Sequence, residues 1–316
     1  MKKNTLYYLE KADGGYVSGT DIAKELGVSR MAVSKAVAEL KKEGAIIESS
    51  TKNGYKLIRS TDTLYAESIK AHLLRELSDI YCYGTVASTN EEAKKLAAAG
   101  AFHSTLICAD AQSAGRGRRG RDFFSPSHTG IYMSVVLRPE KARTDVLYTV
   151  AAAVAVRRVL DRISEEKAEI KWVNDIYISG RKVCGILCEA VSELETGELS
   201  AVICGIGVNL TPPADDFPEE LKQKAGYVSK KEISRAKVIA ELACELVSVL
   251  EEDNDTVISE YAEHSMLTGK EVYYTLGSEH FSGKVEGVDA SGGLIVSKAD
   301  GERTVLRSGE VSLEKI

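Results

Sequence analysis

A short loop concentrates positive charge in a chain that is acidic as a whole. Residues 115–121 read GRGRRGR, within 316 residues whose formal net charge is −6. Arginine forks pair with carboxylate and phosphate oxygens two hydrogen bonds at a time, and glycines let backbone amides approach the same oxygens. The loop therefore predicts a ligand that carries both kinds of group. A solvated Arg-Gly loop that touches RNA non-specifically explains these residues equally well.

The same letters satisfy the dinucleotide-binding pattern G-x-G-x-x-G, but their context opposes it. A Rossmann turn runs directly into a helix, whereas residues 122–127 are DFFSPS, with Pro126 and polar residues that disfavour one. The kinase glycine loop requires valine where Asp122 stands, and no G-x-x-x-x-G-K-[ST] motif occurs. The sequence thus argues against a nicotinamide dehydrogenase, against a protein-kinase glycine loop and against a P-loop.

Composition indicates an ordinary cytoplasmic protein of two or three domains, with no membrane partner. Hydrophobic residues make up 44% of the chain, the N-terminal apolar run is too short for a signal peptide, and no window approaches a membrane span. The six cysteines form no C-x-x-C pair and show no ligand spacing with histidine, so reduced core thiols are predicted rather than disulfides or a zinc cage.

The first sixty residues form a separate electrostatic and structural unit. They hold 11 Lys+Arg against 7 Asp+Glu, a net +4, which leaves −10 for the remainder. Apolar periodicity predicts two helices over residues 20–40, with Thr20 capping the first and Gly27 ending it, and an Asn-Gly hairpin follows over 44–57. A helix-turn-helix with a hairpin is a winged helix, although a small protein-interaction domain has the same pattern. The predicted DNA-binding residues are Ser29, Arg30, Met31, Ser34, Lys35, Lys52 and Lys56.

The rest of the chain alternates strands and helices and then ends in short strands. Strands are predicted at 79–86, 105–109, 130–137, 170–177, 182–189 and 200–208, with helices beginning at Asn90 and spanning 146–163 and 234–251. Five short strands after residue 268 predict a small barrel. The fold class is therefore α/β (α+β), and the domains are expected at 1–61, 62–267 and 268–316.

Five motifs occur in one order behind the winged helix. They are Ser88-Thr89-Asn90, the loop Gly115–Arg121, Lys171-Trp172-x-Asn174-Asp175, Lys182-x-x-Gly185-Ile186-Leu187-x-Glu189 and Gly205-x-Gly207-x-Asn209. With these motifs the whole chain resembles the bifunctional biotin protein ligases that also repress the biotin operon. The resemblance implies a winged helix-turn-helix, a mixed-sheet ligase domain and an SH3-like C-terminal barrel. The chain departs from the commoner pattern of this family at two positions, with Val173 where many relatives carry proline and Phe123 where many carry tryptophan.

The resemblance also implies substrates, partners and a role for each site residue. Biotin would react with MgATP to form biotinyl-5'-AMP and then pass to a lysine of the biotin carboxyl carrier protein of acetyl-CoA carboxylase. The liganded protein would form a homodimer on operator DNA. Catalysis is assigned to Lys182 and Arg118. Biotin binding is assigned to Ser88, Thr89, Asn90, Gln112, Arg116, Gly117, Arg118, Lys182 and Gly185. Adenylate binding is assigned to Arg118, Arg121, Phe123, Asn174, Asp175 and Asn209, with Mg²⁺ held through ATP and Asp175.

Each assignment keeps a structural alternative on local grounds. Ser88-Thr89-Asn90 suits a helix cap, Asn174 and Asp175 suit a turn, and Lys182 suits a solvated hairpin position. Three other functions also remain open for the chain as a whole. They are a lipoate-type acyl ligase, a biotin-sensing repressor with a silent ligase domain, and an RNA-binding protein that uses the Arg-Gly loop.

Overall fold

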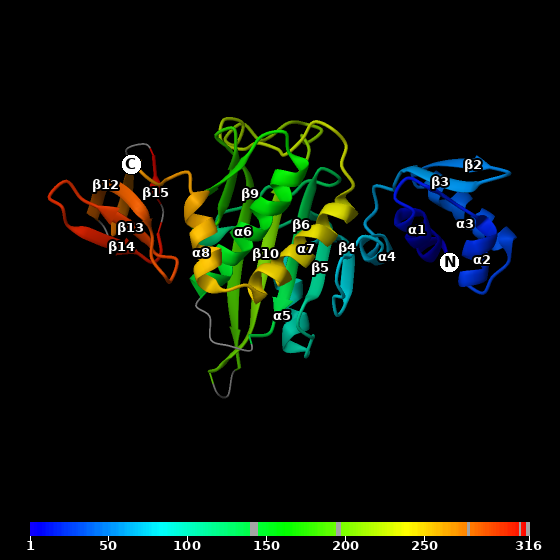
Figure 1. Ribbon diagram of the computed structural model, residues 1–316, viewed down its shortest axis with the longest axis horizontal. Helices are drawn as coiled ribbons and strands as arrows, with labels where there is room; N and C mark the ends of the chain where they lie inside the picture. The colour runs from blue at the N-terminus through cyan, green and yellow to red at the C-terminus, as the bar shows by residue number, and fades with distance from the viewer. Residues whose placement is uncertain (140–144, 194–196, 277–278, 310, 314–316) are drawn as a thin grey trace.

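The computed structural model describes residues 1–139, 145–193, 197–276, 279–309 and 311–313. Three units follow one another along its long axis (Figure 1): a small helical unit at the N-terminus, a large sheet with helices in the middle, and a β-sheet unit at the C-terminus. The predicted mixed α and β content is therefore confirmed. None of the helices in these described ranges has the length and apolar character needed to span a membrane.

The N-terminal unit has the order of a winged helix-turn-helix. It comprises α1 (Lys2–Lys11), β1 (Tyr16–Val17), α2 (Gly19–Glu25), α3 (Arg30–Lys42), β2 (Ile46–Ser50) and β3 (Gly54–Arg59). Ser29 Oγ caps α3 by accepting from the backbone N of Ala32 at 3.2 Å. The predicted cap of α2 was wrong by two residues, because Ser18 rather than Thr20 accepts the capping hydrogen bond. Strand β1, which pairs with β3, was not predicted.

The central unit is built on a seven-stranded mixed sheet with the order β4-β5-β6-β10-β9-β8-β7. Its strands are β4 (Ile80–Val86), β5 (Thr105–Gln112), β6 (Gly130–Leu137), β7 (Ala168–Lys171), β8 (Asp175–Ile178), β9 (Arg181–Ser192) and β10 (Leu199–Asn209). Its helices are α5 (Thr89–Ala98), α6 (Asp145–Ile163), α7 (Arg235–Glu251) and α8 (Asn254–Glu263). The single strand predicted at 170–177 is two strands, β7 and β8, that turn at residues 172–174.

Alternation along the strands decides what covers each face of this sheet. On β6, Ile131, Met133 and Val135 join the large core beneath α6 and α7, whereas Val136 packs with Ala93 and Ala97 of α5 on the opposite face. In the alanine-rich α6, residues 150–156 are each at most 1% exposed. Ser134 and the glycines of β10 therefore face the α5 side.

A short helix that the sequence did not predict, α4 (Ala66–Lys70), connects the N-terminal and central units. Ile69 of this helix packs in the large central core, while Tyr65 just before it packs in the core of the winged helix. Glu10 of α1 is buried beside α4 and accepts from Ser68 Oγ at 2.7 Å, and His72 Nε2 lies 3.0 Å from its other carboxylate oxygen. Burial raises the pKa of the Glu10 carboxyl, but hydrogen bonds from His72, Ser60 and Ser68 lower it below the ordinary 4.5 on balance.

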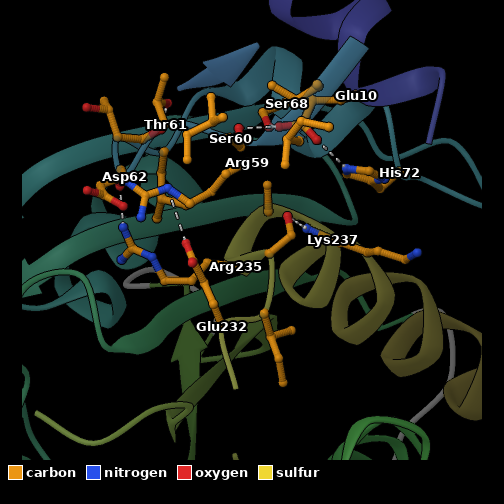
Figure 2. A pocket seen from close by; sticks show the side chains of 18 of the residues that line it. Glu10, Arg59, Ser60, Thr61, Asp62, Ser68, His72, Glu232, Arg235 and Lys237 are labelled. Atoms are coloured by element: carbon orange, nitrogen blue, oxygen red, sulfur yellow. Dashed lines mark hydrogen bonds and ion pairs between the residues drawn. The ribbon is translucent and has the colours of Figure 1, made fainter. Parts of the chain in front are cut away.

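A cavity of about 560 Å³ lies between these two units. Figure 2 shows the side chains that cross it: Arg59 faces Glu232, with the Nε–Oε1 distance at 3.5 Å, and Arg235 reaches the backbone oxygen of Asp62. The buried Arg235 also contacts Asp110 Oδ1 of β5 at 2.6 Å. Polar side chains thus connect the two units across this cavity. The apolar cores of the two units are separate clusters.

The C-terminal unit is a five-stranded antiparallel sheet with the order β14-β13-β12-β11-β15. Its strands are β11 (Glu271–Leu276), β12 (Glu279–Val288), β13 (Leu294–Ser297), β14 (Arg303–Leu306) and β15 (Val311–Ser312). The buried Trp172 indole donates from Nε1 to the backbone oxygen of Gly292 at 2.9 Å, which connects the β7–β8 turn to the β12–β13 turn. The prediction of short C-terminal strands is therefore confirmed.

Candidate active site

Three glycines on neighbouring strands form the floor of the candidate site. Gly185 of β9 pairs with Gly207 of β10, and Gly205 of β10 pairs with Ser134 of β6. A Cβ at Gly207 would lie 2.5 Å from Cε1 of Phe123, and one at Gly185 would lie 3.3 Å from its Cε2. The absent side chains therefore let an aromatic ring lie directly on the sheet. This close approach accounts for the two glycines better than a bulge, because the β9–β10 register is regular here.

A polar network lies beside this floor at the start of α5. Gln112 Oε1 accepts from the backbone N of Thr89 at 2.9 Å, and Gln112 Nε2 donates to Ser125 Oγ at 3.0 Å. Asn90 Nδ2 donates to the Leu187 backbone oxygen at 3.2 Å and to Glu189 Oε2 at 2.7 Å. The predicted residues Thr89, Asn90 and Gln112 are therefore brought together from two parts of the chain.

The predicted cap of α5 was wrong. Ser88 occupies the N-cap position and makes no side-chain capping bond, while Asn90 lies inside the first turn and uses its side chain across the sheet. A capping role would have turned these side chains toward the helix backbone. Ser88, Thr89 and Asn90 are all buried, and the Asn90 amide lies against Gly205 of the floor.

The arginine loop folds back on itself as a small hairpin over this floor. Gly117 N donates to Arg121 O at 2.7 Å, and Phe123 N donates to Gly115 O at 2.9 Å. Arg119 adopts a left-handed conformation with φ 57°, which turns the chain at the tip. Gly115 leaves no space for a side chain, since a Cβ there would lie 2.6 Å from Phe123 O. The hairpin brings Phe123 over Gly185 and Gly207.

Two basic side chains meet the β7–β9 region at the other side of the floor. Lys182 Nζ lies 2.6 Å from Asp175 Oδ1, and its Nζ would be 3.4 Å from a Cβ at Gly185. Arg118 Nη1 donates to Asn174 Oδ1 at 3.3 Å, while Asn174 Nδ2 donates to the Ile186 backbone oxygen at 2.8 Å. Lysine, arginine, amide and carboxylate groups from three segments thus surround one edge of the glycine floor. The peptide bond before Val173 is cis.

The remaining predicted site residues lie at the periphery. Arg116 is exposed and its Nη1 lies 4.0 Å from Glu91 Oε1. Arg121 is also exposed. Asn209 Nδ2 donates to Gly226 O at 3.0 Å, and Gly226 N donates to Lys182 O at 2.8 Å. Asn209 therefore supports the segment that holds the backbone of Lys182.

Several residues of this network were not predicted from the sequence as site residues. Ser134 is completely buried and lies within hydrogen-bonding distance of both Thr89 and Asn90. Lys94 Nζ contacts Glu189 Oε1 at 2.7 Å. Burial lowers the pKa of Lys94, but its hydrogen bonds to Glu189 and Glu91 raise it on balance, so the ammonium stays charged. A polar residue in the middle of the apolar run GIYMSVVL was the one sequence signal that pointed to Ser134.

The predicted DNA-contacting side chains lie on the outer surface of the winged helix. On α3 and its cap, Ser29, Arg30, Ser34 and Lys35 are exposed, and Met31 is 82% exposed. On the wing, Lys52 is exposed, and Lys56 is half-buried with its Nζ 5.9 Å from the ring centre of Tyr16. An exposed methionine beside cations at a helix N-terminus suits contact with base edges in the major groove.

Comparison with known proteins matches all three units. Residues 83–209 match the biotin/lipoate A/B protein ligase family, residues 2–56 match an HTH domain, and residues 268–314 match the biotin protein ligase C-terminal domain. The bifunctional ligase/repressor BirA of Bacillus spizizenii is 34% identical over 96% of both chains. The chain belongs to the family of bifunctional biotin ligase/repressors.

Two further relatives agree with this membership. The bifunctional ligase/repressor BirA of Bacillus subtilis is 37% identical over 76% of this chain and 75% of its own. The structure of the biotin protein ligase of Aquifex aeolicus in complex with biotin and ATP superposes with a TM-score of 0.64 at 27% identity, covering 75% of this chain and 98% of that one. The family resemblance inferred from the five motifs is therefore confirmed.

Proposed function

We propose that this protein activates biotin with ATP to biotinyl-5'-AMP in the cytoplasm and transfers the biotin to a lysine of the biotin carboxyl carrier protein of acetyl-CoA carboxylase. We propose further that, liganded and dimeric, it represses biotin biosynthesis genes. The observation that carries the ligase proposal is the convergence of the arginine hairpin, Lys182 and the Thr89–Gln112 network on one glycine floor. We also propose the domain division 1–61, 62–267 and 268–316.

The site has the charges that adenylation requires. A biotin carboxylate oxygen attacks the α-phosphorus of ATP, and the bond to the leaving pyrophosphate breaks. The Lys182 ammonium and the Arg118 guanidinium neutralise negative charge that gathers on the phosphate oxygens in the transition state. Asp175 holds Lys182 at 2.6 Å, which orients the ammonium before substrate arrives. The carrier lysine amine then attacks the acyl carbon and AMP leaves, so no enzyme nucleophile is needed.

The residues at this edge suit Mg²⁺ bound mainly by nucleotide. Mg²⁺ prefers oxygen ligands and keeps several waters, so one carboxylate plus phosphate oxygens is a common arrangement. Asp175 offers a carboxylate whose side chain is 22% exposed, and Asn174 offers an amide oxygen beside it. We propose that Asp175 contributes to Mg²⁺ binding through ATP, with the ion supplying charge neutralisation at the phosphates.

The arrangement also supports the proposed repressor function. Strand β8 pairs with β9 only over Arg181–Gly185, and the backbone of Ile186 bonds to Asn174, so the 187–192 part of β9 has β10 as its one neighbour strand among the described residues. An unpaired strand edge can add the same edge of a second copy in an antiparallel manner. We propose that liganded copies associate through this edge and that the carrier protein competes for it. Two winged helices would then face a two-fold symmetric operator.

One assay tests the ligase proposal against its alternatives. Purified protein is incubated with MgATP, a carrier domain, and either biotin or lipoate, and the carrier mass is measured. A mass increase with biotin alone is expected, and Lys182→Ala is expected to remove it. An increase with lipoate alone would identify the lipoate-type ligase. No increase with either, together with operator binding that responds to biotin, would identify a catalytically silent sensor.

Operator binding tests the coupling separately. Binding to the DNA upstream of biotin biosynthesis genes is measured with and without biotin plus MgATP. We expect the ligands to strengthen binding and to increase its dependence on protein concentration, because only the dimer presents two winged helices. Equal operator affinity in both conditions would refute the repressor coupling and leave the ligase proposal intact.

A further inference from the structure

Ser134 is a buried hydroxyl in the middle of an otherwise apolar strand. It lies on β6 opposite Gly205, is 0% exposed, and is flanked by Met133 and Val135, which belong to the opposite face. Its Oγ lies 2.8 Å from Thr89 Oγ1 and 2.6 Å from Asn90 Oδ1. A buried hydroxyl is costly unless it is hydrogen-bonded, so both neighbours bear on its orientation.

The amide orientation of Asn90 follows from its other two contacts. Its nitrogen faces the Leu187 backbone oxygen at 3.2 Å and Glu189 Oε2 at 2.7 Å, and both of those atoms only accept. Rotating the amide would set oxygen against oxygen at both positions. The atom that faces Ser134 is therefore the carbonyl oxygen Oδ1, which carries no hydrogen. The hydrogen of this contact must come from Ser134, so Ser134 donates to Asn90.

The direction of that hydrogen bond determines where the hydroxyl hydrogen of Thr89 points. Ser134 Oγ and Thr89 Oγ1 lie 2.8 Å apart. Because the single hydroxyl hydrogen of Ser134 points to Asn90, the hydrogen between these two oxygens must come from Thr89. Gln112 Oε1 is farther from Thr89 Oγ1, at 3.2 Å, and already accepts from the Thr89 backbone N at 2.9 Å. The hydrogen of Thr89 is thus directed into the protein, and toward any further group its oxygen can only accept.

We propose that Ser134 is a positioning residue that makes the Thr89 hydroxyl a hydrogen-bond acceptor, so that the pocket selects a head group carrying an N–H donor. This inference rests on the proposed biotin function. It adds that the protein accepts, and the ligand donates, the hydrogen bond at Thr89. The ureido ring of biotin supplies N–H groups, whereas the dithiolane ring of lipoate supplies none. A ligand without an N–H group would leave the buried acceptor without a hydrogen-bond partner. The site therefore discriminates against such a ligand.

The test compares biotin with a cyclic carbamate analogue in which one ureido N–H is replaced by oxygen, prepared in both regioisomers. Binding is measured by calorimetry without ATP. The full-length protein is expected to bind biotin about tenfold or more tighter than one of the regioisomers, as for the loss of one neutral hydrogen bond. In Ser134→Ala, Thr89 loses its nearer acceptor and keeps only the longer contact to Gln112 Oε1 at 3.2 Å. Its hydrogen can then turn toward the ligand, so we expect that preference to shrink to about twofold.

Control variants separate this role from a structural one. Thr105 is also a fully buried hydroxyl residue, on β5, and its Oγ1 has no hydrogen-bond partner among the described residues. Thr105→Val should therefore keep the full preference for biotin. In a Thr89→Val background, adding Ser134→Ala should change the preference no further, because the group that Ser134 orients is gone. Should Ser134→Ala fail to fold, as checked by thermal unfolding, Ser134→Cys replaces it, with an intermediate preference expected from the weak thiol donor.

The possible outcomes distinguish this inference from the function it rests on. A Ser134 variant that weakens biotin and both analogues equally, or that keeps the full preference, overturns the positioning role. Failure of the unsubstituted protein to bind biotin would overturn the proposed function instead.

Discussion

Gly205→Ala should damage both the stability of the sheet and the binding of biotin. The Cβ would overlap Oδ1 of Asn90 and lie 2.8 Å from its Cγ and 3.0 Å from its Nδ2. Asn90 cannot simply rotate away, because Leu187, Glu189 and Ser134 hold both ends of its amide. Overpacking of this kind costs about 1–3 kcal/mol of unfolding free energy.

The loss in binding follows from the same movement. Displacing Asn90 breaks its bond with Ser134 and shifts the first turn of α5, which carries Thr89. A misplacement of about 1 Å at a positioned group can cost on the order of a hundredfold in activity, so we expect biotin affinity to fall by about tenfold or more. Thermal unfolding measures the first effect, and calorimetric titration with biotin measures the second.

Gly84→Ala is the matched control for this substitution. Gly84 also lies in a strand, but nothing stands within 4 Å of the position that its Cβ would take. Its φ is outside the left-handed region, so alanine there should change stability by no more than about 0.5 kcal/mol. If Gly205→Ala unfolds and binds biotin as Gly84→Ala does, the tight contact between Asn90 and β10 is refuted.

Three further predictions concern the reaction, the domain joint and the DNA surface. Lys182→Ala should slow biotin-dependent pyrophosphate release by about a hundredfold or more while biotin still binds, and an unchanged rate would remove Lys182 from the chemistry. Because hydrogen bonds lower the pKa of Glu10 in the folded state, its carboxylate stabilises the protein above pH 4.5, and this contribution is lost as the pH falls through the folded-state pKa. Glu10→Gln should therefore show a shallower decrease of melting temperature than the unsubstituted protein on acidification, and parallel curves would contradict this. Lys35→Ala should lower the slope of log operator affinity against log salt concentration by about one, because one phosphate contact is lost. Met31→Ala should keep that slope and relax the preference for particular bases. A changed slope in Met31→Ala with an unchanged slope in Lys35→Ala would exclude the predicted docking of α3.

Local patterns in the sequence were sufficient for the winged helix and for most strands. The stripe of Val33, Val37 and Leu40, the Ser29 cap and the Asn53-Gly54 turn are each short-range features, and the structure has α3 and the wing where they indicate. One error arose where a side chain had a stronger distant partner. Asn90 suits a cap by residue type, yet its amide pairs with Leu187 and Glu189 from the far side of the sheet.

The domain joint shows a second limit of sequence reasoning. Helix α4 has only five residues and too few apolar positions to show helical periodicity. It is stable because Ile69 packs in one core and Tyr65 in another, and because Glu10, 58 residues before Ser68, accepts hydrogen bonds from Ser68 and His72. None of those contacts has a local signature.

The sequence by itself determined which chemistry this protein carries: a dense arginine loop, a lysine at fixed spacing from a glycine, and polar residues at strand ends are properties of residue type and order. Only the tertiary structure decided how those groups face one another. Strand pairing placed Gly205 beside Ser134 and Gly185 beside Gly207, which left space for Asn90 and Phe123 on the sheet. Register across a sheet depends on contacts between residues far apart in the chain, so the polarity of the Thr89 hydroxyl could not be inferred until those contacts were known.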